Sequence, residues 1–512
     1  MKQSQISIPV IDIFAGPGGL GEGFSAYRTD GRHGAFKIRL SLEKGKNAHQ
    51  TLQLRAFFRQ FKDGEAPEAY YRLLRQEITI PELYSAYPVQ AAAAASEAIQ
   101  VTLGPGNWDF TRNRIGNALA GAKEWVLIGG PPCQAYSMVG RSRNKGITGY
   151  EAKQDQRHFL YCEYLRILAT FRPSVFVMEN VMGILSSRPE GSLLFEKIRL
   201  DLSHPGKAME SDEEQMDACS ELNYRQYSLA PSGQDSFVIR AEQHGIPQAR
   251  HRVIIVGVRE DLAAICPEPL QVLDPVPLEM VIKDLPRIRS GISRTQDSVG
   301  HWLEVIRQAS DRRWLQTARR REPHIADQME SALARIRAPK ADRGAEFLPH
   351  KSSPAYKPEW YEDQRIGGIC NHQSRTHMQN DLYRYFYAAC FAKAEQNSPK
   401  LKDFPLGLLP DHANVSHAIE RNNLFLDRFR VQLPDRPSTT VTSHISKDGH
   451  AFIHYDPTQC RSMTVREAAR AQTFPDNYLF TGSRTAQYTQ VGNAVPPLLV
   501  NQNAVKTERE AA

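Results

Sequence analysis

The chain has 512 residues, a length that suits about three domains and a large buried core. Lys and Arg number 64 against 57 Asp and Glu, so the net charge of +7 permits a polyanionic partner without requiring one. Apolar residues at 41% and charged residues at 24% exclude a wholly disordered chain. No apolar run reaches the ~18 residues of a membrane span, and the N-terminus lacks the layout of a secretory signal. We therefore expect a cytoplasmic protein with no membrane partner.

Short apolar runs alternate with helical stretches in the first part of the chain. Continuous runs of this length, bounded by Gly or Pro, predict strands buried on both faces, as in a mostly parallel, doubly wound α/β sheet. The segment from about 55 to 123 is too long for a simple crossover and is predicted to be a helical elaboration. The predicted strands are Val10–Phe14, Val126–Ile128, Val175–Met178 and Val253–Val258.

A Gly-rich turn, Asp12 to Gly21, directly follows the first strand. Its glycines at 16, 18 and 21 have the G-x-G-x-x-G spacing, which allows a tight turn and close approach of the backbone to a ligand. Glu43 ends the next apolar run, Ile38–Leu42, where a carboxylate can accept both hydroxyls of a ribose. The pattern predicts a nucleoside-containing cofactor but does not separate a dinucleotide from S-adenosylmethionine. A Gly-rich turn without a ligand remains the alternative.

Cys133 follows the strand Val126–Ile128 in the sequence Gly-Gly-Pro-Pro-Cys-Gln. The carboxyl ends of parallel strands carry the ligand crevice, and two prolines stiffen the loop. A thiol placed there is a candidate nucleophile if nearby positive charge or amide dipoles lower its pKa. A small buried apolar role for this cysteine is the alternative.

Glu179 lies at the end of the strand that begins at Val175, at the same sheet edge as Cys133. A carboxyl group half-buried beside apolar neighbours would hold a proton near neutrality. Arg250 and Arg252 share one face of the extended segment before the strand Val253–Val258, so their guanidiniums are predicted to converge on the same cleft. Pairing of both arginines with solvent is the alternative.

The strand–helix pattern fades after about residue 260 and resumes near 436. The intervening region is punctuated by Pro and locally basic, with five arginines between 312 and 321. Cys370, His372 and His377 lack clear metal-ligand spacing, so no metal is predicted. The chain has seven cysteines, none in Cys-x-x-Cys spacing, which argues against a disulfide framework and favours a reducing compartment.

Together these motifs resemble the cytosine-5 DNA methyltransferases of bacterial restriction-modification or defence systems. The resemblance covers residues 10–260 and 436–500, where the motifs stand in the order of the family. Besides the Gly-rich turn and Glu43, the matching blocks are Pro131-Pro132-Cys133-Gln134, Asp155-x-Arg157-His158, Glu179-Asn180-Val181, Gln248-x-Arg250-x-Arg252, Arg466 to Pro475 and Gln490 to Pro496.

The resemblance implies a Rossmann-like S-adenosylmethionine-dependent methyltransferase fold with a smaller mixed target-recognition domain. It divides the chain into a catalytic domain (1–260), a target-recognition domain (261–435) and a C-terminal return (436–512) that completes the catalytic domain. The family's acidic contact to adenine is not assigned, since Trp125 occupies the place of an acid that the family often has, and Asp109 is left out of the site.

The implied reaction transfers a methyl group to carbon 5 of a flipped-out cytosine in a specific duplex DNA sequence. Cys133 would add to carbon 6 and so make carbon 5 nucleophilic. Glu179 would bond nitrogen 3 and the exocyclic amine, Arg252 the carbonyl oxygen at carbon 2, and Arg250 the same cluster or a phosphate.

The implied cofactor is S-adenosyl-L-methionine. Its predicted contacts are Phe14, Gly16, Gly18, Gly19, Leu20, Glu43, Pro131, Asn493 and Val495. The predicted DNA contacts are Gln134, Ser137, Arg141 and Gln248. Sequence discrimination would belong to 261–435, where the arginines 312–321 either bind phosphates or form a solvated helix face.

Duplex DNA is the predicted partner, with a cognate nuclease or defence-system components as further partners, in the cytoplasm with chromosomal DNA. Three alternatives remain. A transfer-RNA cytosine-5 methyltransferase has nearly the same site residues, and a non-catalytic DNA-binding relative would need neither Cys133 nor Glu179. A dinucleotide-dependent oxidoreductase leaves both of those residues without a role.

Overall fold

The computed structural model describes residues 7–29, 33–132, 160–187, 193–209, 221–231, 236–262, 264, 266–410 and 427–502. The chain divides into two compact units. Unit 1 comprises Met1–Ala66, Tyr84–Asp274 and Ala494–Ala512, and unit 2 comprises Pro67–Leu83 and Pro275–Asn493. Residues 436–493 thus group with 275–435, although the sequence analysis placed all of 436–512 with the first domain. The functional boundaries after 260 and 435 stay predictions.

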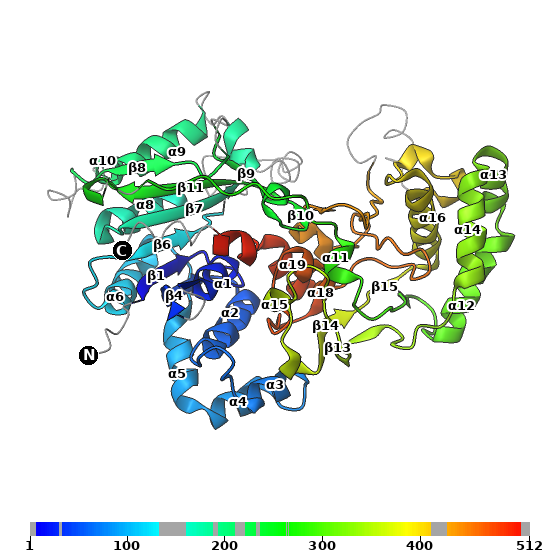
Figure 1. The fold of residues 1–512 in the computed structure, drawn as a ribbon, viewed down its shortest axis with the longest axis horizontal. Helices are drawn as coiled ribbons and strands as arrows, with labels where there is room; N and C mark the ends of the chain where they lie inside the picture. Colours follow the sequence, from blue (N-terminus) through cyan, green and yellow to red (C-terminus); the bar gives the residue numbers. More distant parts are fainter. Residues whose placement is uncertain are drawn as a thin grey trace. The chain divides into compact units, whose positions relative to one another are not determined.

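Unit 1 is built on one large sheet with the strand order β5-β4-β1-β6-β7-β11-β8, and β9 pairs with β11 (Figure 1). The pairings from β5 through β7 are parallel. This mixed, mainly parallel sheet confirms the predicted α/β class. Its strands are β1 (Ile8–Ile13), β4 (Phe36–Glu43), β5 (Ala98–Gln100), β6 (Val126–Gly129), β7 (Val175–Val181), β8 (Tyr224–Tyr227), β9 (Val238–Arg240) and β11 (His251–Arg259).

The core of unit 1 explains why the predicted strands are continuous apolar runs. Alternate strand residues, among them Ile11, Leu127 and Phe176, pack in one cluster with residues of α6, α8 and α9. Val10 and Ile128 belong to the opposite parity and are also fully buried, so both faces of these strands are covered. The unit also contains the short strands β2 (Arg28–Thr29), β3 (His33–Gly34) and β10 (Gln248–Ala249). Its helices are α1 (Gly19–Ala26), α2 (Lys46–Phe58), α5 (Pro88–Glu97), α6 (Trp108–Leu119), α8 (Leu160–Phe171), α9 (Leu194–Ser203) and α10 (Pro205–Met209).

The last predicted strand corresponds to β11, which runs antiparallel to β7. An apolar run predicts a buried strand but carries no information about its direction. The pairing places Arg252 opposite Val181 and Ile254 opposite Glu179. Because β11 is reversed, its beginning lies at the same sheet edge as the end of β7.

The predicted elaboration between 55 and 123 is mainly helical, and a run of five alanines, Ala91–Ala95, lies in α5. Its helix α3 (Glu68–Leu74) belongs to unit 2, and α4 (Ile80–Ala86) follows it. Within unit 2, Tyr70 donates a hydrogen bond to the carbonyl of Asn477 (3.0 Å), and Tyr71 donates one to the carboxylate of Asp363 (2.9 Å). The chain therefore contributes to unit 2 long before the main part of that unit begins.

Gly19 gives a first testable prediction. A Cβ atom on Gly19 would lie 2.3 Å from the carbonyl oxygen of Val495. Because this oxygen belongs to the backbone, no side-chain rotamer change can relieve the clash. We expect Gly19→Ala to lower the free energy of unfolding of unit 1 by about 1–3 kcal/mol, measured by thermal or urea unfolding. Gly116→Ala in α6 is the matched control, because its nearest neighbour is a ring atom at 4.0 Å, and it should stabilise by about 0.5–1 kcal/mol. Equal stability of Gly19→Ala and the unmodified chain would contradict the packing described.

Unit 2 is mixed and mostly helical, with one buried cluster that includes Trp302, Trp314 and Tyr385. Besides α3, its helices are α11 (Glu279–Ile282), α12 (Val299–Arg307), α13 (Arg313–Arg321), α14 (Pro323–Arg335), α15 (Pro358–Tyr361), α16 (Gln379–Glu395), α18 (Val465–Ala471) and α19 (Arg484–Asn493). Its strands are β12 (Gly291–Ile292), β13 (Gly344–Pro349), β14 (Gly368–Gln373), β15 (Thr376–His377) and β16 (Ser438–Thr439). Across the described ranges of both units, no helix has the length and apolar character needed to cross a membrane.

Three fully buried histidines in unit 2 have strongly lowered pKa values. Burial lowers the pKa of His377 to about 3 and the pKa values of His372 and His454 to about 4. An unfolded histidine titrates near ~6.5, so below that pH the unfolded chain binds protons that the folded chain does not. The stability that these histidines contribute is complete above that pH and is lost as the pH falls. Burial raises the pKa of Asp12 in unit 1 to about 8. Through this residue, acidification therefore stabilises unit 1, the opposite of its effect on unit 2.

We expect the free energy of unfolding of unit 2 to fall between pH 6.5 and pH 4.5. Each of the three histidines contributes a loss of up to about 1.4 kcal/mol per pH unit. Calorimetry at a series of pH values should show the unit 2 transition moving to lower temperature on acidification. A transition temperature that is constant or rises over that range would contradict the prediction.

Candidate active site

The Gly-rich turn after β1 has the backbone conformation that its glycines predict. Gly16 and Gly18 have positive φ angles of 59° and 99°. Phe14 adopts a φ of 55°, a backbone conformation that residues other than glycine rarely adopt. The N–H of Gly16 donates to Oε2 of Glu43 (2.9 Å), while the N–H of Gly45 donates to Oε1 (2.5 Å). The structure thus brings together the predicted turn and the predicted ribose-binding acid, which ends the neighbouring strand β4.

Asp12 is a feature of this turn that the sequence analysis did not single out. Its side chain is fully buried, and its Oδ2 would lie 3.0 Å from a Cβ atom built on Gly21 of α1. Burial raises its pKa to about 8, against the opposing effects of Arg59 and the backbone of Gly21. The carboxyl group therefore holds a proton at neutral pH, which makes its burial beneath the turn less costly.

The segment after Asn493 closes over α1. Val495 is buried with its carbonyl oxygen against Gly19, and Asn501 donates a side-chain hydrogen bond to the carbonyl of Gly23 (3.2 Å). Val495 thus lies beside the turn, and its contact with the cofactor stays a prediction. Asn493 is exposed at the end of α19 in unit 2, and its contact with the cofactor stays a prediction.

Glu179 and Arg252 form an ion pair, with Nε of Arg252 2.7 Å from Oε1 of Glu179 and both side chains 13% exposed. Gly130, at the end of β6, lies so close that a Cβ atom on it would be 2.9 Å from Oε2 of Glu179. The ends of β6 and β7 and the beginning of β11 therefore meet around one carboxylate. Three of the predicted motifs, distant in sequence, converge here.

Arg250 completes this group from the segment just before β11. It is 2% exposed, and burial lowers its pKa well below the usual value, with a further lowering by Arg252 and an opposing effect of Glu179. Among these three side chains, two guanidiniums accompany one carboxylate in a poorly solvated place. Such an arrangement favours a substrate that presents an oxygen with partial negative charge. Gln248 is fully buried, which does not support a direct contact between its side chain and DNA. That contact stays a prediction.

Asn180 connects this group to the loop that leads to Cys133. Its Nδ2 donates to the carbonyl of Pro131 (3.2 Å), its Oδ1 accepts from the N–H of Val181 (2.8 Å), and the residue is 4% exposed. The sequence analysis quoted Asn180 in a motif but gave it no role. The sequence signal for a role of Asn180 was its position directly after Glu179, the acid near the end of β7. Asn180 is a positioning residue for the Pro-Pro segment.

We expect Asn180→Ala to lower kcat by about 10²-fold, because a shift of ~1 Å at a reacting group costs about that much. Cofactor affinity should change little, so the measurements are steady-state methyl transfer and equilibrium cofactor binding on the same preparation. Gln226→Ala is the control, since Gln226 makes a comparable structural hydrogen bond to Ser203 (2.9 Å) away from this loop. An unchanged kcat for Asn180→Ala would remove its positioning role.

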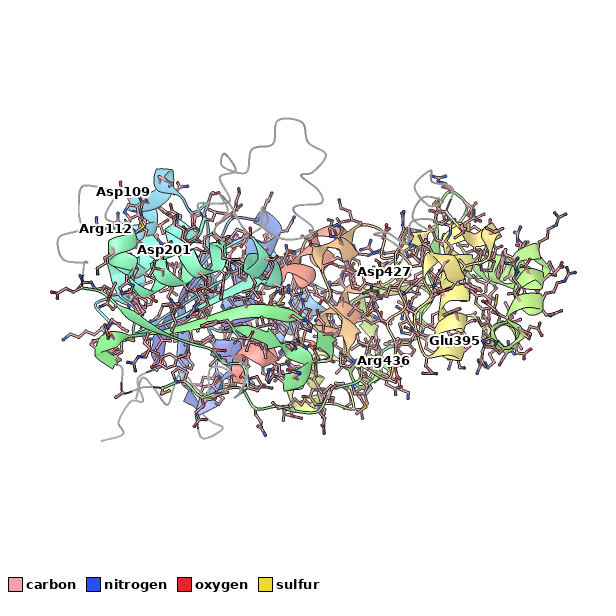
Figure 2. The ribbon with its side chains drawn as sticks, turned by 90° about the horizontal axis from the view of Figure 1, so that it is seen from above. Asp109, Arg112, Asp201, Glu395, Asp427 and Arg436 are labelled. Atoms are coloured by element: carbon pink, nitrogen blue, oxygen red, sulfur yellow. The ribbon has the colours of Figure 1, made fainter. Side chains whose placement is uncertain are left out.

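Several predicted site residues lie outside the described residues, namely Cys133, Gln134, Ser137, Arg141 and the Asp155-x-Arg157-His158 block. Asp109 is exposed in the first turn of α6 (Figure 2). The adenine-contacting acid remains unassigned.

The histidines considered for metal binding have other partners. His372 contacts the hydroxyl of Thr464 (3.0 Å) and the carbonyl of Pro286 (2.8 Å), and His377 contacts the hydroxyl of Ser462 (3.2 Å). Within the part of the chain that the structure describes, no group of three or more potential ligands gathers around a metal position. Their hydrogen bonds give them structural roles, and the absence of a metal stays a prediction. Five cysteines in the same part are free thiols.

The arginines 312–321 lie on and just before α13, whose Trp314, Leu315 and Ala318 are buried. The arginines are exposed. Arg319 pairs with Glu330, and the guanidinium of Arg312 lies 5.2 Å from the ring centre of Tyr383. The structure therefore shows an exposed basic helix face, and phosphate binding by that face stays a prediction.

The mainly parallel sheet, with the Gly-rich turn after β1 and Glu43 at the end of β4, has the fold of an S-adenosylmethionine-dependent methyltransferase. The fold matches a solved E. coli structure described as a DNA modification methyltransferase encoded within a prophage, with a TM-score of 0.51 at 17% identity, covering 98% of this chain and 99% of that one. This likeness supports the fold alone.

The sequence comparisons identify the family. A family model described as C-5 cytosine-specific DNA methylase matches residues 117–508. The Type II methyltransferase M.Bpa9945I of Bacillus paralicheniformis is 33% identical over 511 residues, covering 96% of each chain. The DNA (cytosine-5-)-methyltransferase M.ApeKI of Aeropyrum pernix is 26% identical over 430 residues, covering 77% of this chain and 82% of that relative. The chain belongs to the C-5 cytosine-specific DNA methylase family, which confirms the resemblance and the predicted enzyme class.

Proposed function

We propose that this enzyme transfers the methyl group of S-adenosyl-L-methionine to carbon 5 of a cytosine flipped out of duplex DNA, through a covalent adduct with Cys133. The observation that carries the proposal is the convergence of Gly130, Glu179, Arg250 and Arg252 at one sheet edge. The loop to Cys133 starts from that edge and is held there by Asn180. An acid and two guanidiniums match the polar edge of a cytosine.

The residues around the Gly-rich turn fit the proposed cofactor. Among the described residues, and apart from Gly16 and its two chain neighbours, no atom lies within 4 Å of a Cβ position on Gly16, so a ligand has room to approach the backbone at this point. Glu43 is oriented by two N–H groups and ends the strand next to the turn, where a carboxylate suits a ribose. Phe14, Gly18, Leu20, Pro131 and Val495 would complete the pocket. The cofactor supplies an electrophilic methyl group.

The side chains then prepare the cytosine for that methyl group. Addition of the Cys133 thiolate to carbon 6 would give carbon 5 enamine character. Glu179 would bond nitrogen 3 and the exocyclic amine, and Arg252 would bind the oxygen at carbon 2. Once carbon 5 has taken the methyl group and the methyl–sulfur bond of the donor has broken, loss of the carbon-5 proton to a base would release the cysteine and restore the ring. The positive excess around Glu179 stabilises the charge that develops on the ring as sulfur adds.

We further propose that residues 261–435 read the target sequence and that the enzyme acts on chromosomal DNA in the cytoplasm beside a cognate nuclease. The relatives named type II methyltransferases support the nuclease partnership. The exposed arginines near α13 support binding to the phosphate backbone.

The direct test incubates the purified chain with labelled S-adenosylmethionine and either duplex DNA or transfer RNA. Label in DNA, located at cytosine carbon 5, supports the proposal. Label in RNA alone would favour the RNA-directed alternative, and label in neither would favour a non-catalytic DNA-binding relative. Sequencing of methylated cytosines from cells that express the chain would then give the target sequence.

A further inference from the structure

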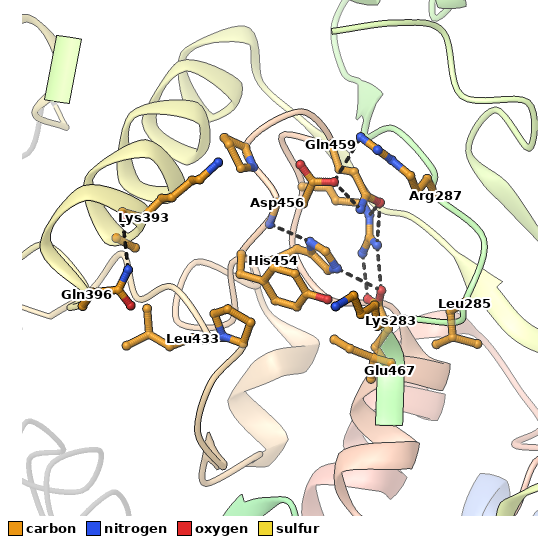
Figure 3. A pocket seen from close by; sticks show the side chains of 16 residues that line it. Lys283, Leu285, Arg287, Lys393, Gln396, Leu433, His454, Asp456, Gln459 and Glu467 are labelled. Carbon is orange, nitrogen blue, oxygen red and sulfur yellow. Dashed lines mark hydrogen bonds and ion pairs between the residues drawn. The ribbon is translucent and has the colours of Figure 1, made fainter. Parts of the chain in front are cut away.

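A cavity of about 500 Å³ lies inside unit 2, between the end of α11, the last turn of α16 and the segments 433–434 and 454–459 (Figure 3). Its volume is within the range of small-molecule sites, ~300–1,000 Å³. No residue assigned above to methyl transfer or cofactor binding lines it. A ligand of this cavity would therefore be distinct from the substrate and the cofactor of the proposed reaction.

The lining of the cavity includes apolar residues and an aromatic ring. Leu285, Leu433 and Pro434 line it together with Tyr455. His454 stacks on Tyr455 with ring centres 4.4 Å apart and planes 25° from parallel. Because His454 is buried and covers one side of the Tyr455 ring, the ring is held in place as a platform for a second planar group.

The charged residues of the lining leave a positive excess. The carboxylate of Glu467 accepts two hydrogen bonds from the guanidinium of Arg461, at 2.6 and 2.7 Å, and both residues are fully buried. Asp456 pairs with Arg287 at 3.1 Å. These two carboxylates are thus already matched by two guanidiniums.

Two further cations, Lys283 and Lys393, come from different helices and are exposed at the opening. Among the described residues, the one ion pair of Lys283 is with the neighbouring surface residue Glu279 (3.0 Å), and Lys393 has no ion pair. Surface pairs of this kind are worth little, so Lys283 can exchange its partner for a ligand anion. The cavity thus combines a planar aromatic ring with two available positive charges.

We propose that this cavity binds a nucleoside monophosphate, with its base against Tyr455 and its phosphate at the lysine-bearing opening. A phosphate monoester carries about −1.5 to −2 charges at neutral pH, which matches the excess of two cations. The apolar part of the lining excludes inorganic phosphate alone as a good ligand, because that anion would leave the aromatic platform unused. A free nucleoside would leave the lysines unmatched.

Titration calorimetry on the full chain tests this with UMP and GMP, neither of which carries the adenine of the proposed cofactor. We expect one equivalent of at least one of them to bind, and uridine, guanosine and inorganic phosphate to bind at least tenfold more weakly. Lys283→Gln combined with Lys393→Gln should weaken nucleotide binding at least tenfold. Tyr455→Leu should reduce nucleotide affinity to that of inorganic phosphate.

Lys340→Gln combined with Lys402→Gln is the matched control, since both lysines are exposed in unit 2 and neither lines the cavity. It should bind nucleotide as the unmodified chain does. Thermal unfolding and methyl transfer of each lysine variant confirm that the fold is kept. Absence of nucleotide binding at millimolar concentration, equal binding of inorganic phosphate, or binding that survives the Lys283/Lys393 change would each overturn the proposal.

Discussion

Methyl transfer by Cys133→Ala is expected to fall at least about 10⁴-fold, a loss typical of removing the nucleophile of a covalent mechanism. Without the thiolate, carbon 5 of cytosine has no enamine character and does not attack the methyl group. Cofactor affinity should be unchanged, because the residues at the Gly-rich turn remain. Incorporation of labelled methyl groups into DNA and equilibrium cofactor binding are measured on the same protein.

Cys266→Ala is the control for this experiment, since Cys266 is an exposed free thiol in unit 1. It should transfer methyl groups at the rate of the unmodified chain. Turnover by Cys133→Ala within tenfold of that rate would show that the nucleophile is another residue.

The second large effect is expected for Arg252→Ala, which should lower kcat by about 10²–10³-fold, the usual cost of removing one donor to a developing charge. The change removes the ion-pair partner of Glu179 as well as the proposed contact to the cytosine oxygen. Truncation of one member of a poorly exposed pair also destabilises the fold, so rates must be normalised to the folded fraction. Arg252→Lys should recover stability more than rate, because an ammonium group does not reproduce the guanidinium geometry.

Arg259→Ala provides a matched control on the same strand. Arg259 ends β11 away from Glu179 and pairs with Asp261 at 2.6 Å. The Arg259→Ala variant should lose some stability and keep the methyl-transfer rate per folded chain of the unmodified protein. Equal losses of rate in Arg252→Ala and Arg259→Ala would mean that β11 acts only through stability.

Much of unit 1 could be predicted because its strands are apolar on both faces. Residues such as Val10 and Ile11 face opposite sides of β1 and are both fully buried, which leaves an uninterrupted apolar run in the sequence. Glu43 and Glu179 could be located because each ends such a run. The placement of catalytic groups at strand ends follows from sheet geometry and needs little knowledge of side-chain packing.

The features that sequence reasoning missed depend on contacts between distant segments. The direction of β11 has no local signature in the sequence, and the position of Asn180 after a strand-ending acid does not show that its side chain bonds Pro131. The protonated, buried state of Asp12 depends on α1 and its surroundings. The grouping of 436–493 with unit 2 likewise reflects packing of α18 and α19 that no motif encodes.

The position of Val495 against Gly19 has a consequence for synthesis on the ribosome. The Gly-rich turn is covered by residues that are translated several hundred positions after it. A nascent chain that has emerged as far as residue 480 therefore still lacks the strip that closes over α1. Translation products interrupted before Val495 would carry an incomplete first unit, and only chains that extend past it would acquire the segment that packs against Gly19.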